Sequence, residues 1–421
     1  MFNQRFNTLI SLLVILIALI ACGQGQATDR IADRIATRRG DTGNAIAPTQ
    51  APGNVQSPVV APTLDTELGS PPTPTSIPEV NPTPAAPSSG SGTAVTVAGA
   101  PEACGSTFAP GPIAEGYGAD GPYGVTVQTI PHPAWDGHEV TIFYPSGLEG
   151  QAVPVIFFAH GFAAISPTWY AGFANHVASR GYAFVFSPYP ILGRDFGVKY
   201  DQIWAGFQAA VEQTKQPFDL SRVGFAGHSF GGGAVPALAY RGLVEQGWGK
   251  SGALLYLLAP WYLLDISQAQ LQQLPANTKV HMQVYGDDLT NDPRIAIDIY
   301  KSIQVPASEK DYVVINSATF GDCFLEANHL AAGSAPGMTN SLDYYGVYRL
   351  FDGLADYTFN GNDIGRRVAL GHGDPLQTDM GVWPETNAPL ADLTSEYANP
   401  QPNRPESDYS NPFDGPANPR D

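Results

Sequence analysis

Apolar segments alternate with amphipathic segments through the middle of the chain. The apolar segments are typical of buried strands, and the amphipathic ones have the three-to-four-residue spacing of helices. The expected strands are Glu139–Pro145, Val153–Gly161, Tyr182–Pro190, Arg222–Gly227, Ala253–Trp261, Lys279–Gly286 and Lys310–Asn316. The expected helices are Trp169–Gly181, Asp201–Lys215, Gly231–Glu245, Arg294–Ile303 and Ser341–Phe359. This alternation predicts an α/β fold, with a mostly parallel central sheet and helices on both faces.

The first 22 residues show a different pattern. Leu9–Ala21 is apolar apart from Ser11, which is too short to span a bilayer comfortably but suits a signal peptide. The sequence Leu19-Ile20-Ala21-Cys22 resembles the lipobox of bacterial lipoproteins, which implies lipid on Cys22 and anchoring by two acyl chains. The alternatives are an ordinary signal peptide, or an uncleaved anchor, with an incidental cysteine. All three predict export, to the outer side of the cell membrane or into the medium.

Two Pro-rich stretches flank the patterned region. Residues 23–103 are rich in Pro, Thr, Ser and Ala and have almost no aromatic residues, so they cannot bury enough apolar surface to offset the entropy of ordering. We expect this stretch to be a disordered linker to a globular domain at residues 104–393. Residues 394–421, which are rich in Pro and Asn, are expected to form a loose tail.

Charge and composition limit the classes of partner and cofactor that this chain is expected to bind. The 421-residue chain has a formal net charge of −18 and no basic run, which argues against a nucleic-acid partner because phosphates are bound by clustered Lys and Arg. We interpret the acidity as favouring solubility. No His, Cys or carboxylate group has the spacing of metal ligands, and no dinucleotide fingerprint follows a strand. We therefore expect no metal or organic cofactor, and we expect a monomer.

The three cysteines are Cys22, Cys104 and Cys323. If Cys22 carries lipid, the other two remain as a pair in a compartment that permits disulfides. A Cys104–Cys323 bridge would close a large loop and stabilise the fold by several kcal/mol in the chain-entropy model. Two buried free thiols are the alternative.

The segment GFAGHSFGGG, Gly224–Gly233, places Ser229 in a Gly-x-Ser-x-Gly pattern. An apolar strand leads into this serine and a Gly-rich helix start follows it. A nucleophile elbow needs this layout, because the tight strand-to-helix turn leaves room only for very small neighbouring residues. We therefore interpret Ser229 as a nucleophile.

A serine hydroxyl needs a general base, which in this type of fold follows the last strand in the chain order Ser, Asp, His. His329 lies in the loop after the last expected strand, and His372 is the second choice. His281 falls inside a strand, so we expect it to be structural. His228 is next to Ser229, but its ring should point into the fold at a sharp turn.

The acid that orients the base should follow the strand Lys279–Gly286. Asp287 and Asp288 both qualify, with Asp292 further out. We favour Asp288 as the residue that holds the imidazole tautomer.

The oxyanion hole needs two N–H donors. Phe230 follows the nucleophile and supplies one, and Phe162, in the sequence AHGF after an early strand, supplies the other. We expect His160 of the same sequence to make structural hydrogen bonds beneath the site.

Taken together, these motifs resemble those of the α/β-hydrolase fold, especially dienelactone hydrolases, platelet-activating-factor acetylhydrolases, and bacterial cutinases with polyester hydrolases. The motifs that carry the resemblance are IFYP, HGF, GHSFGGG, LLAPW, GDD and NH. The resemblance implies that Phe162 and Trp261 flank the acyl group; plain core packing is the alternative for Trp261. The chain departs from the pattern in about a dozen extra residues before His329 and in a longer C-terminal part.

We therefore expect an exported serine hydrolase that cleaves carboxylic esters of small molecules or polymers through a Ser229–His329–Asp288 triad and an acyl-enzyme. Amides, thioesters or lactones are alternative substrates for the same residues. A binding protein on a scaffold that has lost its activity is the alternative from another class.

Overall fold

The computed structural model describes residues 103–193 and 195–414. The predicted signal peptide, the predicted lipid on Cys22 and almost all of the predicted linker lie outside these residues. Within the described ranges, no helix combines the length and the apolar character that crossing a membrane would require.

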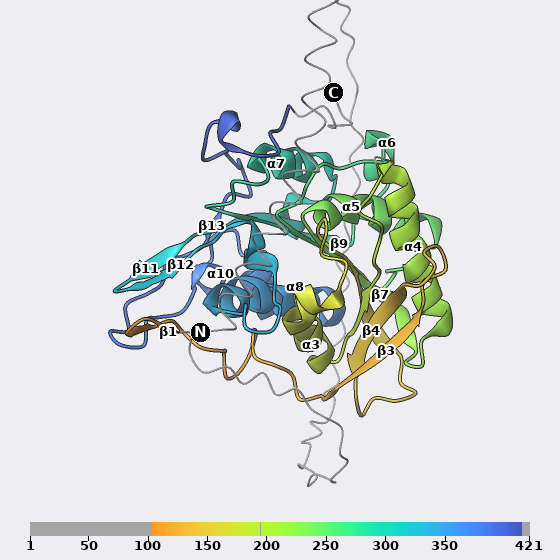
Figure 1. The fold of residues 1–421 in the computed structure, drawn as a ribbon, viewed down its shortest axis with the longest axis horizontal. Helices are drawn as coiled ribbons and strands as arrows, with labels where there is room; N and C mark the ends of the chain where they lie inside the picture. Colours follow the sequence, from red (N-terminus) through yellow and green to blue (C-terminus); the bar gives the residue numbers. More distant parts are fainter. Residues whose placement is uncertain (1–102, 194, 415–421) are drawn as a thin grey trace, which may run out of the picture. The chain divides into compact units, whose positions relative to one another are not determined.

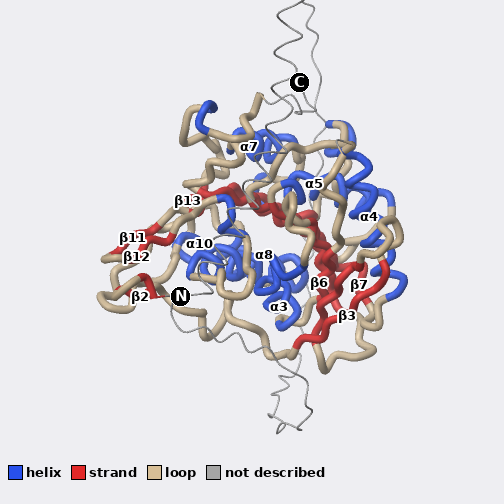
Figure 2. Tube along the Cα trace, viewed as in Figure 1, coloured by secondary structure: helices blue, strands red, loops and turns tan. Residues whose placement is uncertain are grey.

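A nine-stranded sheet runs through the molecule, in the order β13-β10-β9-β8-β7-β5-β6-β4-β3 (Figures 1 and 2). The six strands from β10 to β6 are parallel, and β13, β4 and β3 pair antiparallel at the two ends. The mostly parallel α/β architecture predicted from the sequence is therefore confirmed. The strands are β3 (Val125–Pro131), β4 (Glu139–Pro145), β5 (Val153–Ala159), β6 (Ala183–Phe186), β7 (Phe218–His228), β8 (Gly252–Leu258), β9 (Thr278–Tyr285), β10 (Lys310–Ile315) and β13 (Thr394–Ser395).

Helices cover both faces of the sheet (Figure 1). One face carries α3 (Ala171–Ser179), α8 (Arg349–Asn360), α9 (Asp363–Ala369) and α10 (Pro375–Thr378). The other carries α4 (Phe196–Gln213), α5 (Phe230–Ala239), α6 (Gln268–Leu271) and α7 (Pro293–Ser302). Two expected helices are divided, since α5 continues as a π-helical segment, Tyr240–Glu245, and α8 is preceded by another, Leu342–Tyr348.

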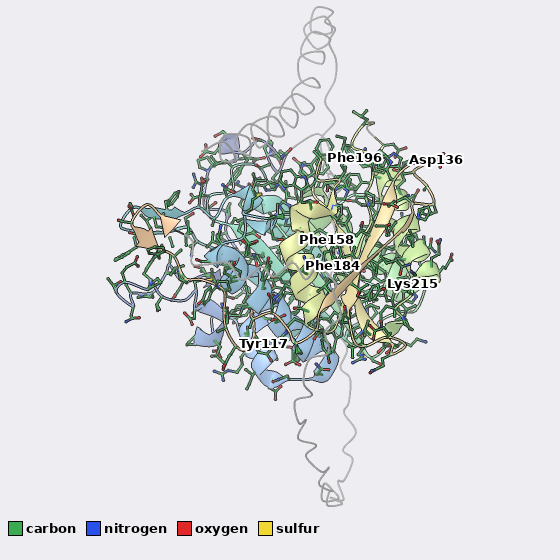
Figure 3. All side chains as sticks on the ribbon, turned by 60° about the horizontal axis from the view of Figure 1, so that its bottom comes forward. Tyr117, Asp136, Phe158, Phe184, Phe196 and Lys215 are labelled. Atoms are coloured by element: carbon green, nitrogen blue, oxygen red, sulfur yellow. A yellow bond between two sulfur atoms is a disulfide. The ribbon has the colours of Figure 1, made fainter. Side chains whose placement is uncertain are left out.

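Alternating side chains of the strands fill two hydrophobic cores, one on each face. Phe157 of β5 packs on Phe207 of α4, and its neighbour Phe158 points to the other face and packs on Phe173 of α3. Phe184 of β6 stacks on Phe158, and both are labelled in Figure 3. Strands that are apolar on both faces therefore become the middle layer of a three-layer structure.

The order of the strands reverses at β5, because β6 lies on one side of it and β7 on the other. The chain then leaves β5 toward α3 on one face and leaves β7 toward α5 on the other. In an open α/β sheet, this reversal opens a crevice at the carboxyl ends of the two strands. Phe162 follows β5 and Ser229 follows β7, so the fold brings both predicted residues to this crevice.

The C-terminal segment differs from the loose tail that the composition predicted. β13 pairs with β10, with Thr394 opposite Val314 and Ser395 opposite Val313. Further along, the Ser410 N–H donates to the carbonyl of Leu289, so residues 394–414 pack on the domain. Backbone pairing and Asn side chains hold this segment in place. Neither kind of interaction produces a periodic pattern of apolar residues, which is the pattern that predicts ordered structure from sequence.

The predicted disulfide between Cys104 and Cys323 is present. It joins a small hairpin, β1 (Ala103–Cys104) and β2 (Thr107–Phe108), to a second one, β11 (Ala318–Phe320) and β12 (Cys323–Leu325), at one side of the domain (Figure 1). The adjacent Asp322 carboxylate accepts the N–H groups of Ser106 (2.7 Å) and Thr107 (2.9 Å), which hold its pKa well below the usual range. The chain that leads to His329 is therefore tied to the N-terminal end of the described domain.

Candidate active site

Ser229 lies in the sharp turn between the end of β7 and the start of α5. Its φ of 54° and ψ of −120° are uncommon for a residue with a side chain. The surrounding backbone holds this conformation, because the Ser229 N–H donates to Leu258 O (2.9 Å) and the Trp261 N–H donates to Ser229 O (2.8 Å). The strand-to-helix elbow predicted from GHSFGGG is thus the observed geometry.

Glycines permit this turn by letting the backbones approach closely. A Cβ on Gly231 would lie 1.9 Å from the carbonyl oxygen of Ala159, and one on Gly227 would lie 2.5 Å from the carbonyl oxygen of Gly231. Both positions therefore exclude any side chain. The sequence around Ser229 is Gly-rich because β5, the elbow and α5 meet there.

The structure brings Ser229, His329 and Asp288 into one hydrogen-bonded chain. His329 Nε2 lies 2.9 Å from Ser229 Oγ, and His329 Nδ1 lies 2.7 Å from Asp288 Oδ2. Since a carboxylate only accepts, Nδ1 carries the hydrogen and Nε2 presents its lone pair to the serine hydroxyl. This is the tautomer that a base needs in order to take the serine proton.

The three predicted acids have separate roles. Asp288 is 6 % exposed, and its Oδ1 accepts the N–H groups of Thr290 (2.7 Å) and Asn291 (3.1 Å), which fixes the carboxylate against His329. Asp287 instead accepts a hydrogen bond from Ser317 Oγ (2.6 Å) and pairs with Arg404. Asp292 caps the N-terminus of α7. The geometry therefore agrees with the choice of Asp288.

His228 holds the site together without contacting the serine hydroxyl. Its Nε2–H donates to the carbonyl of His329 (2.9 Å), and its Nδ1 accepts from the Tyr170 hydroxyl (2.9 Å). That hydroxyl in turn accepts the Gly161 N–H (3.0 Å). Burial, with the nearby His329, lowers the pKa of His228 well below its usual value, so this ring stays neutral. The elbow, the loop after β5 and the loop of His329 share these bonds.

Phe162 and Phe230 are placed as the oxyanion prediction requires. Phe230 is the first residue of α5, so its N–H has no partner within the helix. Phe162 follows β5 in a turn closed by the Ala164 N–H on Gly161 O (3.1 Å), with Ala163 at a φ of 68°. Within residues 103–193 and 195–414, neither N–H donates to a backbone carbonyl, so both can donate to an oxygen at the crevice.

His160 lies beneath this loop and is fully buried. Its Nδ1–H donates to Gly161 O (2.7 Å), and its Nε2 accepts the Tyr189 N–H (3.3 Å). Burial lowers the pKa of His160 to about 4. A neutral ring with both nitrogens bonded within the fold has the structural role that was predicted.

Aromatic side chains pack together beside the elbow of Ser229. Trp261 and Phe162 are half-buried, and Trp261 packs on Phe230 with ring centroids 5.8 Å apart. Phe196, the first residue of α4, packs edge-on against Trp261, with ring centroids 5.4 Å apart. The sequence prediction missed Phe196 and Tyr170, because neither lies in a recognisable motif and both reach the site from other elements of the fold.

The other histidines lie away from Ser229. His281 is buried in β9, where its Nδ1 lies 2.9 Å from the carbonyl oxygen of Ala369. His372, the second choice for the base, is within 3.0 Å of the carbonyl oxygen of Lys310, at the start of β10. Ser229 lies at the opposite, carboxyl-terminal edge of the parallel strands. The structure thus brings His329 to the serine and leaves His372 at the other end of the sheet.

No family model matches the chain, and no curated protein matches it. Among residues 103–193 and 195–414, no group of three or more His, Cys, Asp or Glu side chains is arranged to hold a metal ion. A serine hydroxyl bonded to an oriented imidazole can act as a nucleophile toward an electrophilic carbonyl.

Proposed function

We propose that this chain is an exported serine hydrolase of the α/β-hydrolase fold that cleaves carboxylic esters. The observation that carries the proposal is the hydrogen-bonded chain from Asp288 through His329 to Ser229. The strand order with its reversal at β5, and the elbow after β7, support the fold assignment. An oriented base, a serine in a strained turn and two N–H donors together favour acyl transfer over binding alone.

In the first half of the reaction, Ser229 Oγ attacks the ester carbonyl carbon while His329 Nε2 takes the serine proton. Asp288 stabilises the imidazolium that forms and does not itself take a proton. The carbonyl oxygen becomes an oxyanion that the N–H groups of Phe162 and Phe230 stabilise. His329 then gives its proton to the leaving alcohol, and the acyl group stays on Ser229.

In the second half, His329 takes a proton from water, and the hydroxide that forms attacks the acyl carbon. Collapse of the second tetrahedral intermediate returns the proton to Ser229 and releases the carboxylic acid. The half-buried rings of Trp261 and Phe162 would flank the acyl group. Trp261 packs on Phe230, the residue after Ser229, and Phe162 carries one of the two N–H donors. Their apolar faces favour ester substrates with apolar acyl chains or rings.

The test is turnover of p-nitrophenyl acetate and longer p-nitrophenyl esters by the mature chain and by Ser229→Ala. We expect turnover by the wild-type chain and its loss in Ser229→Ala. His329→Ala should abolish turnover too, and His372→Ala is the matched control that should keep it. Absence of serine-dependent turnover across short and medium acyl chains would refute the proposal, and loss in His372→Ala alone would refute the choice of base.

A further inference from the structure

We propose that residues Asn403–Phe413, here called the C-terminal strap, are a positioning segment for Asp288. The inference rests on the proposed hydrolase function and assigns a role to the part of the chain that was expected to be a loose tail. The strap lies on the loop between β9 and α7, residues 286–292, here called the acid loop.

Backbone hydrogen bonds pair the strap with the acid loop. The Ser410 N–H donates to Leu289 O (3.0 Å), the Asn411 N–H donates to Thr290 O (2.8 Å), and the Asp292 N–H donates to Asn411 O (3.0 Å). Asn411 and Asn291 form a parallel bridge. These bonds hold Leu289, Thr290 and Asp292 of the acid loop. The strap therefore restricts the backbone that carries Asp288.

The same residues hold the catalytic carboxylate. Asp288 Oδ1 accepts the N–H groups of Thr290 and Asn291, and Asn411 Nδ2 donates to Thr290 O (3.1 Å) and Asn291 Oδ1 (3.1 Å). Asn291 Nδ2 in turn donates to Ala259 O (2.9 Å). The Asn411 side chain therefore bonds both residues whose N–H groups fix Asp288. One of these residues, Asn291, is also anchored to Ala259, directly after β8.

The N-terminal end of the strap connects the acid loop to the loop of the base. Arg404 pairs with the Asp287 carboxylate, whose other oxygen accepts Ser317 Oγ–H (2.6 Å). Ser317 Oγ accepts the Ala327 N–H (2.8 Å), and the Asp287 N–H donates to Ala327 O (2.9 Å). Ala327 is two residues before His329. Asp287 is therefore a positioning residue that joins the strap, the acid loop and the base loop.

The strap also closes the space behind Asp288. Tyr409 is buried, and its hydroxyl donates to Asn403 Oδ1 (2.8 Å) within the strap. Both residues line a small cavity together with Asp288 and Asn291. The Arg294 guanidinium of α7 also donates to Arg404 O (3.0 Å). Without the strap, this side of the acid loop would face water, and the loop would lose its bonds to Arg404, Ser410 and Asn411.

The proposal predicts a loss of catalysis without a matching loss of folding. A displacement of about 1 Å in a catalytic group can cost about 100-fold in rate. We expect a chain that stops after Gln401 to lose at least about 10-fold in kcat on p-nitrophenyl acetate, with KM changed less than about 2-fold. Inactivation by a fluorophosphonate should slow by the same factor, because it reports the reactivity of Ser229. A chain that stops after Asp414 keeps the strap and is the matched control.

Point variants separate positioning from general stability. Asn411→Ala removes two donors to the acid loop and leaves the backbone bridge, and should lower kcat in the same direction as the truncation. Arg404→Ala should also lower kcat, and Arg404→Lys should restore part of it by keeping the charge on Asp287. Hydrogen exchange at the amides of Thr290 and Asn291 should accelerate in Asn411→Ala, with the thermal melting temperature nearly unchanged.

Three results would overturn the inference. The first is an unchanged kcat after removal of the strap. The second is a fall in kcat that only follows a fall in melting temperature. The third is unchanged exchange at Thr290 and Asn291 in Asn411→Ala, which decides the case if the truncated chain fails to fold. Failure of the hydrolase proposal can be told apart from failure of the strap inference. In the first case the wild-type chain would show no Ser229-dependent turnover, and the exchange measurement would still test the strap.

Discussion

Tyr170 offers a sharp test of how the elements of the candidate site are held together. Its single hydroxyl group hydrogen-bonds both the loop after β5 and the elbow after β7. The Tyr170 hydroxyl accepts the Gly161 N–H at 3.0 Å and donates to His228 Nδ1 at 2.9 Å, and all three groups are buried. Tyr170→Phe removes this oxygen and keeps the ring. Two buried polar groups then lose their partner, while the apolar packing of the ring on Phe158 stays.

The expected cost follows from the number of groups that are left unsatisfied. A buried polar group without a partner costs about 1–3 kcal/mol, so Tyr170→Phe should lower the free energy of unfolding by about 2–6 kcal/mol. It should also lower kcat, because Gly161 precedes Phe162, the proposed oxyanion donor, and His228 bonds the carbonyl of His329. Chemical denaturation by urea measures the first effect, and turnover of p-nitrophenyl acetate measures the second.

Tyr312 supplies the matched control. Its hydroxyl is buried in β10, and over the described residues no hydrogen-bond partner contacts it. Tyr312→Phe makes the same chemical change, but it removes a group that is already unsatisfied, so stability should stay level or rise. Equal destabilisation by the two substitutions would refute the reasoning, because loss of the hydroxyl group itself, and not loss of its hydrogen bonds, would then decide the outcome.

Two further predictions concern stability. Burial alone would lower the pKa of His176, but the charge of Asp352 and the hydrogen bonds that His176 donates to Asp352 and Asp120 outweigh it and raise the pKa to about 9. This folded-state pKa lies above the usual 6.5, so protonated His176 stabilises the fold by about 3 kcal/mol. The full stabilisation is present below pH 6.5, and it is lost as the pH rises through 9. The difference in unfolding free energy between wild type and His176→Gln should therefore shrink by about that amount from pH 6 to pH 10, and a pH-independent difference would contradict it. Replacing Cys104 and Cys323 by Ser should lower the free energy of unfolding by about 2–5 kcal/mol in equilibrium denaturation, and wild type with reductant should match the double variant.

The sequence pattern predicted the parts of the structure whose physical cause is local. Strands such as β4 and β5 are apolar on both faces, so their bounds were found within two residues. The elbow was predictable because the close approach of backbones at Gly227 and Gly231 requires glycine, and glycines can be read directly from the sequence. His329 and Asp288 followed from the order of strands and loops along the chain, without any knowledge of distance.

The rest depends on contacts between distant parts of the chain. Nothing near Tyr170 in sequence indicates that its hydroxyl meets Gly161 and His228, because α3 and the elbow are separate elements. The Pro- and Asn-rich segment after β13 lacks apolar periodicity, so its order arises from backbone pairing with the acid loop. Such pairing is a property of two segments together, and a pattern along one of them cannot reveal it.

Four residues of the candidate site differ in what holds them in place. Ser229 and Phe230 are held by the junction of β7 and α5, where neighbouring strands and a helix constrain the backbone directly. Asp288 and His329 lie on loops beyond the ends of β9 and β10, and the sheet constrains them only at the strand ends. The strap holds one loop and the disulfide-tied hairpin β11–β12 leads into the other, so both ends of the described domain contribute to the geometry. Partial unfolding of either end should therefore impair the Asp288–His329 pair before the nucleophile elbow is disturbed.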